Sequence, residues 1–396
     1  MASHAQKVRD PGSYKISSGL KSAFIALVLL GVVTFLYGLK VDAERAWSSF
    51  VINHFYFMSL ALGGAFFAAI QWVTGAMWSA PVRRLAEAFT AYLPVSIVTF
   101  VILYFGIHHL YIWSHPQFVK GDQVLEGKAS YLNISFFMAR NILALIFWYA
   151  FAGKMVCNSI KQDESGDFAY TLKNRVLSPI FLLVFALTFT MASFDQLMSL
   201  DPHWFSTIFG IYCFAGLVYS TFAALCIITY LLRNKLRGIV NTNHFHDIGK
   251  FMFAFTVFWA YIGFSQYMLI WYANLPEETG YFIKRFHEKW FYVSAFLLVG
   301  KFLTPFFILL PRDAKRNADL LFKVAVFMLI AQWIDMMWIV QPEFYIHGPR
   351  VGLIEILMTA GFVGMFGLAV SRFLSRHNIV AIGDPRLAES VYKHHQ

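Results

Sequence analysis

The sequence predicts an all-α polytopic membrane protein with ten transmembrane helices, arranged as two four-helix bundles (helices 2–5 and 6–9) plus flanking helices 1 and 10. Hydrophobic residues make up 58% and charged residues 14% of the 396 residues, a balance that excludes an ordinary soluble protein. The apolar residues also form long continuous runs and do not alternate with polar ones, so spanning helices are expected and strands are not.

Ten apolar runs are long enough to cross a bilayer. In chain order they occupy residues 22–39, 51–73, 88–113, 132–156, 177–200, 204–232, 248–273, 289–310, 318–341 and 351–374. The first run follows a polar basic arm and leads into further membrane segments, which indicates a retained helix and not a cleaved signal peptide. A polar turn with Pro81, Arg83 and Arg84 joins the second and third runs. Only Asp201-Pro202-His203 separates the fifth from the sixth, which predicts a tight hairpin.

A repeated pattern predicts the two bundles. Asp195 lies seven residues before Pro202, and Asp335 lies seven residues before Pro342, each time at the end of an apolar run. At 1.5 Å per residue, each carboxyl is expected about 10 Å inside the helix end, where an acid is costly. Helices 3, 4 and 5 resemble helices 7, 8 and 9 in order and in polar placement, so we expect a parallel internal repeat.

We therefore expect one integral membrane domain over residues 1–396. Its predicted parts are a flanking helix at 22–39, a first bundle at 51–200, a second bundle at 204–341, a second flanking helix at 351–374 and a cytoplasmic tail at 375–396.

Basic residues predict the orientation. Of the 32 Lys and Arg, 22 lie in or beside the N-terminal arm, the loops after helices 2, 4, 6 and 8, and the tail, whereas 8 lie in or beside the opposite loops. The positive-inside rule then places both termini in the cytoplasm and both Asp-x6-Pro elements at the outer face. The net charge of +10 is a topology signal and does not indicate nucleic-acid binding.

Polar and ionisable residues gather near the outer ends of the predicted helices. The candidates for a quinol or proton site are His108, His109, Arg140, Asp195, Asp201, His203, Gln266, Lys301, Asp335 and Glu355, with Tyr267 beside Gln266. Arg140 and Lys301 precede the two acids by one helix, so the pairs Arg140–Asp195 and Lys301–Asp335 are expected. Each pair is suited to relay protons or to serve as a structural ion pair. The relay is favoured for Asp195, because His108 and His109 are expected in the same bundle, whereas the bundle of Asp335 offers Gln266 and Tyr267 as neighbours. A histidine near an acid supplies the proton acceptor that a quinol hydroxyl needs.

Several polar features also have simpler interpretations. Glu355 is expected to be a snorkelling or interfacial acid, and His244-x-His246-Asp247 a solvated helix start. Gly63-Gly64 is expected to permit close helix contact. The three cysteines are Cys157, Cys213 and Cys226, and they show no haem-attachment or iron–sulfur spacing. No covalently bound cofactor and no metal site is therefore predicted.

Two segments carry a resemblance to a known family. Residues 193–216 (SFDQLMSLDPHWFSTIFGIYCFAG) and 247–279 (DIGKFMFAFTVFWAYIGFSQYMLIWYANLPEET) resemble the NrfD/PsrC-like integral membrane subunits of bacterial alternative complex III. The resemblance runs over nearly all ten helices and is strongest to the smaller of the two related membrane subunits in that complex.

The resemblance implies a membrane subunit of a quinol:cytochrome c oxidoreductase in the respiratory electron-transport chain of a bacterial inner membrane. It implies menaquinol or ubiquinol as substrate, and haem c and iron–sulfur clusters in periplasmic partner subunits. A homologous NrfD-like membrane subunit, membrane lipids and a terminal oxidase are the other implied partners. It also implies two four-helix bundles and proton half-channels. No catalysis is expected from this chain alone, because it holds no redox centre.

Two other functional classes stay open. A structural membrane anchor with a degenerate quinol site would explain the lack of cofactor motifs, but it leaves the repeated buried acid unexplained. A proton-coupled secondary transporter would share the ten helices and buried charges. It is less favoured, because no pair of Gly/Pro-interrupted helices marks a midplane site.

Overall fold

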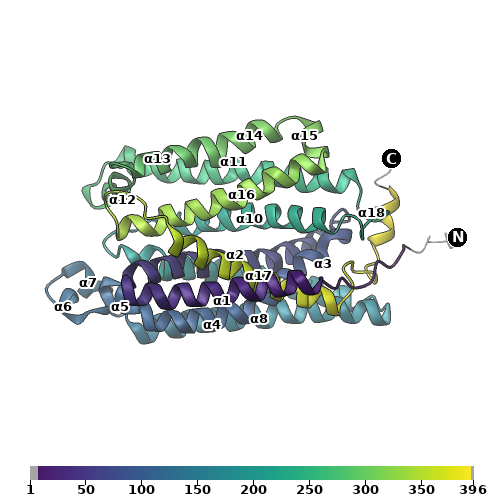
Figure 1. Cartoon of the computed structure of the whole chain (residues 1–396), viewed down its shortest axis with the longest axis horizontal. Helices are drawn as coiled ribbons and strands as arrows, with labels where there is room; N and C mark the ends of the chain where they lie inside the picture. The colour runs from purple at the N-terminus through teal and green to yellow at the C-terminus, as the bar shows by residue number, and fades with distance from the viewer. Residues whose placement is uncertain (1–7, 394–396) are drawn as a thin grey trace.

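A computed structural model describes residues 8–393, which form helices joined by loops (Figure 1). Within that range ten spans are long and apolar enough to cross a membrane, which confirms the predicted fold class. In chain order they are α1 (Ser18–Val41), α2 (Ala43–Thr74), α3 to α5 (Ala80–Leu110), α8 (Ile134–Ser165), α9 with a final turn (Ala169–Leu200), α10 (Phe209–Leu231), α11 (Thr242–Ala273), α13 to α14 (Trp290–Leu309), α16 with a final turn (Ala318–Glu343) and α17 (Leu353–Arg376).

Two of the spans are broken, and short helices lie between spans. The third span consists of α3 (Ala80–Phe89), α4 (Leu93–Leu103) and α5 (Ile107–Leu110), joined by 3₁₀ turns. The eighth consists of α13 (Trp290–Phe296), a π-helical segment (Leu297–Leu303) and α14 (Thr304–Leu309). The helices outside the spans are α6 (Pro116–Val119), α7 (Gln123–Lys128), α12 (Pro276–Phe286), α15 (Arg312–Arg316) and α18 (Leu387–Lys393).

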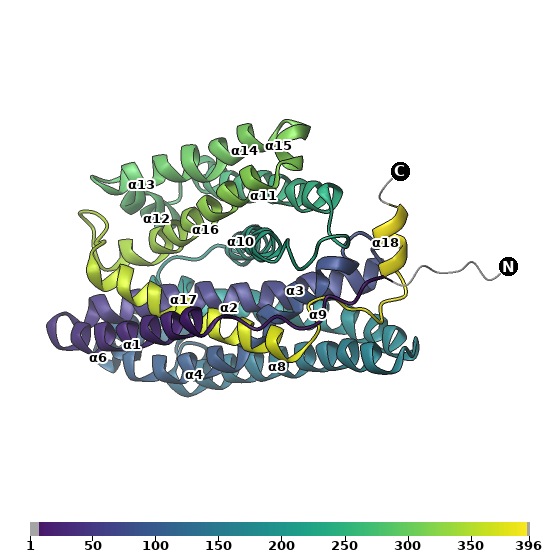
Figure 2. The ribbon, with the colours of Figure 1, turned by 45° about the vertical axis from the view of Figure 1, so that its right-hand side comes forward.

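The spans pack as the two predicted bundles. The first consists of α2, α3 to α5, α8 and α9, and the second of α10, α11, α13 to α14 and α16. Helix α10 joins them, because it packs against α2 and α9 as well as against its own bundle (Figure 2). The flanking helices α1 and α17 pair with each other along their length and lie against α2 and α3. The last span, α17, therefore packs against the first bundle beside α1.

Glycines set the closest helix contacts. A Cβ atom added to Gly31 of α1 would lie 2.6 Å from the Cα of Gly361 in α17, so only hydrogen atoms fit between these backbones. A Cβ on Gly63 would lie 1.7 Å from Oγ1 of Thr221 in α10, and one on Gly64 would lie 2.3 Å from the backbone oxygen of Ala86 in α3. The expected role of Gly63-Gly64 in close helix contact is therefore confirmed, and these residues seat α2 against both neighbours.

Figure 1 shows both ends of the chain on one side of the molecule, beside α18. We call this side the tail end, and the opposite side, which carries α6, α7 and α12, the loop end. The tail end is the side predicted to face the cytoplasm.

Several helix limits differ from the predicted ones, because polar capping turns extend a helix beyond its apolar run. Helix α2 begins at Ala43 and not at 51, and Asp42 caps it by accepting from the Arg45 N–H at 3.1 Å. Helix α11 begins at Thr242, so the His244 motif lies within its first turns. The expected helix start is confirmed, but its solvation was wrong for His244 and Asp247, which are buried, and His244 Nε2 lies 3.2 Å from Ser390 Oγ of α18.

The link between α9 and α10 is also longer than predicted. Helix α10 begins at Phe209 and not at 204, so Asp201–Ile208 is irregular. The ring of Trp204 stacks on Tyr281 of α12 with 3.8 Å between ring centroids, which holds the chain away from a helical path. The predicted three-residue hairpin is therefore wrong, and the link connects the two bundles at the loop end.

The C-terminal tail folds back onto the helices. Ile379 and Val380 are fully buried, and the backbone N–H of Gly383 donates to Asp163 Oδ1 of α8 at 2.8 Å. Arg83 and Arg84, predicted to lie in a polar turn, are buried in α3. They pair with three buried or nearly buried acids: Glu87, Asp163 and Asp384. This ion-pair cluster anchors the tail, because leaving any of these charges buried without a partner would be costly.

Candidate functional site

The first bundle contains a buried ion pair between Asp195 of α9 and Arg140 of α8. Arg140 donates from Nε to Oδ2 at 3.0 Å and from Nη2 to Oδ1 at 2.9 Å, which is the predicted pairing. Asn141 Nδ2 adds a third donor to Oδ2 at 2.9 Å. The guanidinium lies over the rings of Tyr131 and Phe136, 3.8 and 4.1 Å from their centroids. The carboxylate of this first centre is therefore well satisfied, and its base is shielded by aromatic rings.

A buried polar series continues inward from this pair. Gln196 Nε2 donates to Asn141 Oδ1 at 2.9 Å, and the Gln196 amide neighbours His54 of α2. His54 Nδ1 lies 2.8 Å from Thr99 Oγ1, whereas its Nε2 and the Gln196 Oε1 have no hydrogen-bond partner among residues 8–393. Sequence reasoning missed His54, because a single histidine has no spacing pattern. The only indication in the sequence was that His54 lies in the middle of an apolar run.

The second bundle contains the matching pair between Asp335 of α16 and Lys301. Lys301 Nζ lies 2.6 Å from Asp335 Oδ2 and donates to Gln332 Oε1 at 2.8 Å. Tyr212 of α10 donates its hydroxyl to Asp335 Oδ1 at 2.5 Å. The ammonium also lies 3.8 Å from the ring centroid of Trp259. Lys301 and Asp335 are 0% and 1% exposed, so this second centre is sealed within the described chain.

Local features of the backbone position the side chains of the second centre. Lys301 lies in the π-helical segment Leu297–Leu303, and single π-helical turns within α-helices are frequent at functional sites. Gln332 and Asp335 are three residues apart on α16 and therefore share one face. Gly216 of α10 makes room for the amide, because an added Cβ would lie 2.7 Å from Gln332 Nε2.

The two centres occupy equivalent places, with the acid on the fourth helix of each bundle and the base on the third. They differ in chemistry. In the first, a guanidinium and a carboxamide hold the acid, and neither group gives up a proton at physiological pH. In the second, an ammonium and a phenol hold it, and both groups exchange protons with a carboxylate more readily.

The predicted histidines do not join the first centre. His108 and His109 are exposed, and His108 Nδ1 lies 3.0 Å from Ser114 Oγ in the local loop. Their neighbours point inward instead: Tyr111 donates its hydroxyl to the Gln196 backbone oxygen at 2.9 Å, and Trp113 Nε1 donates to that of Ser199 at 3.2 Å. The reason is the end of α5 at Leu110, which turns the following aromatic residues toward the bundle.

Gln266 and Tyr267 were expected near Asp335 and are not its partners. Gln266 is buried, and its Oε1 has no hydrogen-bond partner within the described part of the chain. The ring of Tyr267 packs edge-on against Phe282 and Phe286 of α12. Tyr212 and Gln332 contact the Lys301–Asp335 pair instead, and no spacing pattern in the sequence distinguishes either residue.

A second ionic network joins the bundles at the loop end. Lys284 Nζ of α12 lies 2.8 Å from Asp201 Oδ2 and 2.6 Å from Glu343 Oε2, and Arg285 Nη1 lies 3.3 Å from Glu343 Oε1. Burial alone would raise the pKa of Asp201, but the hydrogen bond and charge of Lys284 lower it below its ordinary value. Burial would lower the pKa of Lys284, but Glu343 and Asp201 raise it. Both groups therefore stay charged near neutral pH.

The remaining candidates lie elsewhere. His203 is half exposed and lies 2.6 Å from Asp122 Oδ2 at the loop end, outside both centres. Glu355 is 1% exposed and accepts two 2.7 Å hydrogen bonds from Arg45 of α2 and a third from the Gly352 N–H. Of the two expectations for Glu355, a snorkelling acid was wrong because the side chain is buried, and an interfacial acid stays a prediction; its hydrogen bonds connect α17 to α2.

No protein-family model and no curated protein matches this chain. Across residues 8–393, no group of three or more His, Cys, Asp or Glu side chains is arranged to hold a metal ion.

Proposed function

We propose that this chain is the proton-handling membrane subunit of a quinol:cytochrome c oxidoreductase, as its resemblance to the NrfD/PsrC-like subunits implies. The observation that carries the proposal is the repeated buried acid–base pair, Arg140–Asp195 in one bundle and Lys301–Asp335 in the other. Iron–sulfur and c-type haem subunits would take the electrons, and menaquinol or ubiquinol would supply both electrons and protons. An ionisable group inside a membrane bundle is a functional candidate by default.

The second centre is better suited to proton exchange. A proton accepted by Asp335 neutralises a carboxylate that Lys301 and Tyr212 hold from two sides at 2.6 and 2.5 Å. Lys301 is able to give its own proton to Asp335 and, once neutral, to take it back with little movement of heavy atoms, while Tyr212 keeps its hydrogen bond to the carboxyl group. Arg140 does not give up its proton, so the first pair offers Asp195 no partner for proton exchange. In this proposal Lys301–Asp335 exchanges protons, and Arg140–Asp195 fixes the first bundle.

A small cavity of about 10 Å³ lies at the loop end and is lined by Asp201, Tyr281, Arg285 and Glu343, among others. That volume is close to the space for a single water molecule. A water there would join the loop-end ionic network, and in this proposal protons leave the second bundle on that side.

A charge-neutral double variant tests the proposal. Asp335→Asn with Lys301→Gln removes both charges and leaves no unpaired ion, so the complex should assemble with its full haem content. If the pair exchanges protons, proton release into the medium by proteoliposomes should fall well below that of the wild type during quinol-dependent cytochrome c reduction. The matched control is Asp195→Asn with Arg140→Gln, which should assemble and keep most of its proton release. Full proton release by the Asp335→Asn, Lys301→Gln variant would overturn the proposal.

A structural anchor is the second candidate function, and one observation favours it. Three hydrogen bonds satisfy the carboxylate of Asp195, and four, one of them from Ser49 Oγ at 3.4 Å, satisfy that of Glu355. An ion pair whose carboxylate is fully hydrogen-bonded fixes the packing of its two helices, and this role requires no change in the charge of either residue. In the anchor case, both neutral double variants would retain proton release once assembled.

A further inference from the structure

The tail half of the first bundle contains a group of buried polar side chains that neither acid–base pair uses. Asn158 Nδ2 of α8 donates to Asn174 Oδ1 of α9 at 2.9 Å, and Gln162 Nε2 of α8 donates to Thr171 Oγ1 of α9 at 2.6 Å. All four side chains are buried. Helix α8 ends at Ser165, so at 1.5 Å per residue the group extends ~10 Å into the span. Polar side chains at such a depth mark water-filled cavities or functional sites.

A charged group adjoins these polar side chains at the tail end. Arg84 Nη2 of α3 donates to Ser159 Oγ at 3.1 Å and to Asp163 Oδ2 at 2.7 Å, and its Nε lies 3.1 Å from Glu87 Oε2. The side chains of Arg84 and Glu87 are 0% and 1% exposed. Arg84 Nη1 has no hydrogen-bond partner within the described part of the chain. A buried donor without a partner is a place where water binds if it can enter.

The chain after α17 covers this charged group. We call residues 377–393 the tail strap. The backbone N–H of Gly383 donates to Asp163 Oδ1 at 2.8 Å, and a Cβ atom added to Gly383 would lie 2.4 Å from the backbone oxygen of Gln162. The strap is therefore pressed directly onto α8 beside the charged group, and only a glycine fits at this point.

Two further contacts attach the tail strap to both bundles. The carboxylate of Asp384 pairs with Arg83 of α3, and both side chains are 3% exposed. Further along the strap, Ser390 Oγ of α18 lies 3.2 Å from Nε2 of His244, in the first turns of α11. The strap thus crosses the tail end from the first bundle to the second.

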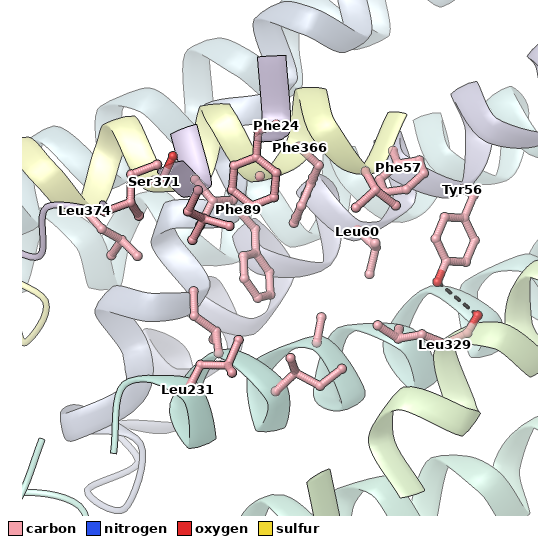
Figure 3. A pocket seen from close by; sticks show the side chains of 18 of the residues that line it. Phe24, Tyr56, Phe57, Leu60, Phe89, Leu231, Leu329, Phe366, Ser371 and Leu374 are labelled. Carbon is pink, nitrogen blue, oxygen red and sulfur yellow. Dashed lines mark hydrogen bonds between the residues drawn. The ribbon is translucent and has the colours of Figure 1, made fainter. Parts of the chain in front are cut away.

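The tail strap also connects α17 to the second bundle where their helices do not meet. An apolar cavity of about 780 Å³ lies between α17 and α10. Figure 3 shows Phe366 and Leu374 of α17 on one side of it and Leu231 of α10 on the other. Leu374 lies two residues before the end of α17, where the strap begins. The strap therefore bridges two parts of the fold that the cavity separates.

We propose that the tail strap is a gate. It closes a polar inlet at the tail end of the first bundle, and its release admits water to Arg84 and to the polar side chains behind it. Because the strap is attached to α3 and α8 at one point and to α11 at another, a change in the spacing of the bundles would lift Gly383 from α8. This inference does not depend on the proposed redox function, and its test measures water access alone.

The first test lifts the tail strap by steric contact. Ser159→Cys places a thiol in the charged group, in a chain that also carries Cys157→Ser to remove the exposed cysteine. Its reaction with a charged, water-soluble methanethiosulfonate is followed by mass spectrometry on the full chain in lipid nanodiscs. Adding Gly383→Val should raise the labelling rate at least about tenfold, because the new side chain cannot fit against Gln162 and the strap must open locally.

Two controls accompany this test. Gly153→Ala in α8 meets no atom within 4 Å and should leave the labelling rate unchanged. Ser193→Cys, in place of Ser159→Cys, puts a thiol at a fully buried position in the loop half of the same bundle. It should stay unlabelled when Gly383→Val is present. Equal labelling of both thiols would overturn the proposal, because the whole bundle would then have opened and not its tail end.

The second test removes an ionic contact of the tail strap. Arg83→Gln with Asp384→Asn deletes one charge of each sign and should also raise the labelling rate of the Ser159→Cys thiol. The matched control is Arg233→Gln with Asp319→Asn, an exposed pair at the tail end, which should not change the rate. A thiol that reacts as fast with the strap intact as in either strap variant would show that the strap closes nothing.

Discussion

Asp195 and Arg140 form a two-point ion pair, at 3.0 and 2.9 Å, that is almost fully withdrawn from solvent. Its partner groups come from neighbouring helices 55 residues apart in sequence. An interaction of this kind is costly to break from one side, because the remaining charge stays buried.

Asp195→Asn should therefore destabilise the protein strongly. The variant leaves Arg140 without its counter-charge, at a cost of ~3–5 kcal/mol for a buried pair. A clear drop in the thermal unfolding midpoint in detergent is expected. Asp319→Asn breaks an exposed pair with Arg233 and should leave the midpoint nearly unchanged. Equal midpoints for Asp195→Asn and the wild type would show that the pair contributes no stability.

Gly216→Ala should impair the second centre without unfolding the chain. The new Cβ would lie 2.7 Å from Gln332 Nε2 and 3.0 Å from its Oε1, so the amide must turn away and Lys301 loses an acceptor. Under the proposed function, we expect reduced proton release by the assembled complex at normal haem content. Gly153→Ala in α8 meets no atom within 4 Å and serves as the control. Normal proton release in Gly216→Ala would mean that Gln332 does not position Lys301.

His54→Leu should separate proton transfer from stability. The Thr99 hydroxyl also lies 3.1 Å from the backbone oxygens of Val95 and Ser96, so it stays satisfied when the imidazole is removed. The variant also removes an unpartnered ring nitrogen, so the unfolding midpoint should hardly fall. Because the proposal assigns proton exchange to Lys301–Asp335, proton release should also stay close to that of the wild type, and a clear drop would show that the series from Asp195 to His54 carries protons. A lower midpoint with unchanged proton release would assign His54 a packing role.

The loop-end network should show a defined pH window. The lowered pKa of Asp201 adds stability that is lost as pH falls below its ordinary value of 3.8. The raised pKa of Lys284 adds stability that is lost as pH rises above 10.5. The decrease in the thermal unfolding midpoint caused by Lys284→Gln should therefore be constant between about pH 5 and 9 and should become smaller outside that range. Lys120→Gln, also at the loop end, is the control. A difference that already varies between pH 5 and 9 would contradict these assignments.

The sequence alone determined the membrane class, the ten spans and the two bundles. Continuous apolar runs and a repeated Asp-x6-Pro spacing are local features, and hydropathy and helical rise convert them directly into spans and depths. The pairing of Arg140 with Asp195 and of Lys301 with Asp335 followed as well, because a buried charge at that depth needs a counter-charge on a neighbouring helix.

Only the tertiary structure decided which side chains complete each centre. His108 and His109 face outward and His54 faces inward, because rotation about a helix axis depends on packing against several helices at once. The choice of Tyr212 over Tyr267, the burial of the tail and the cavity beside α17 have the same origin. Each depends on contacts between residues more than 50 positions apart, and the sequence of a single helix does not specify such contacts.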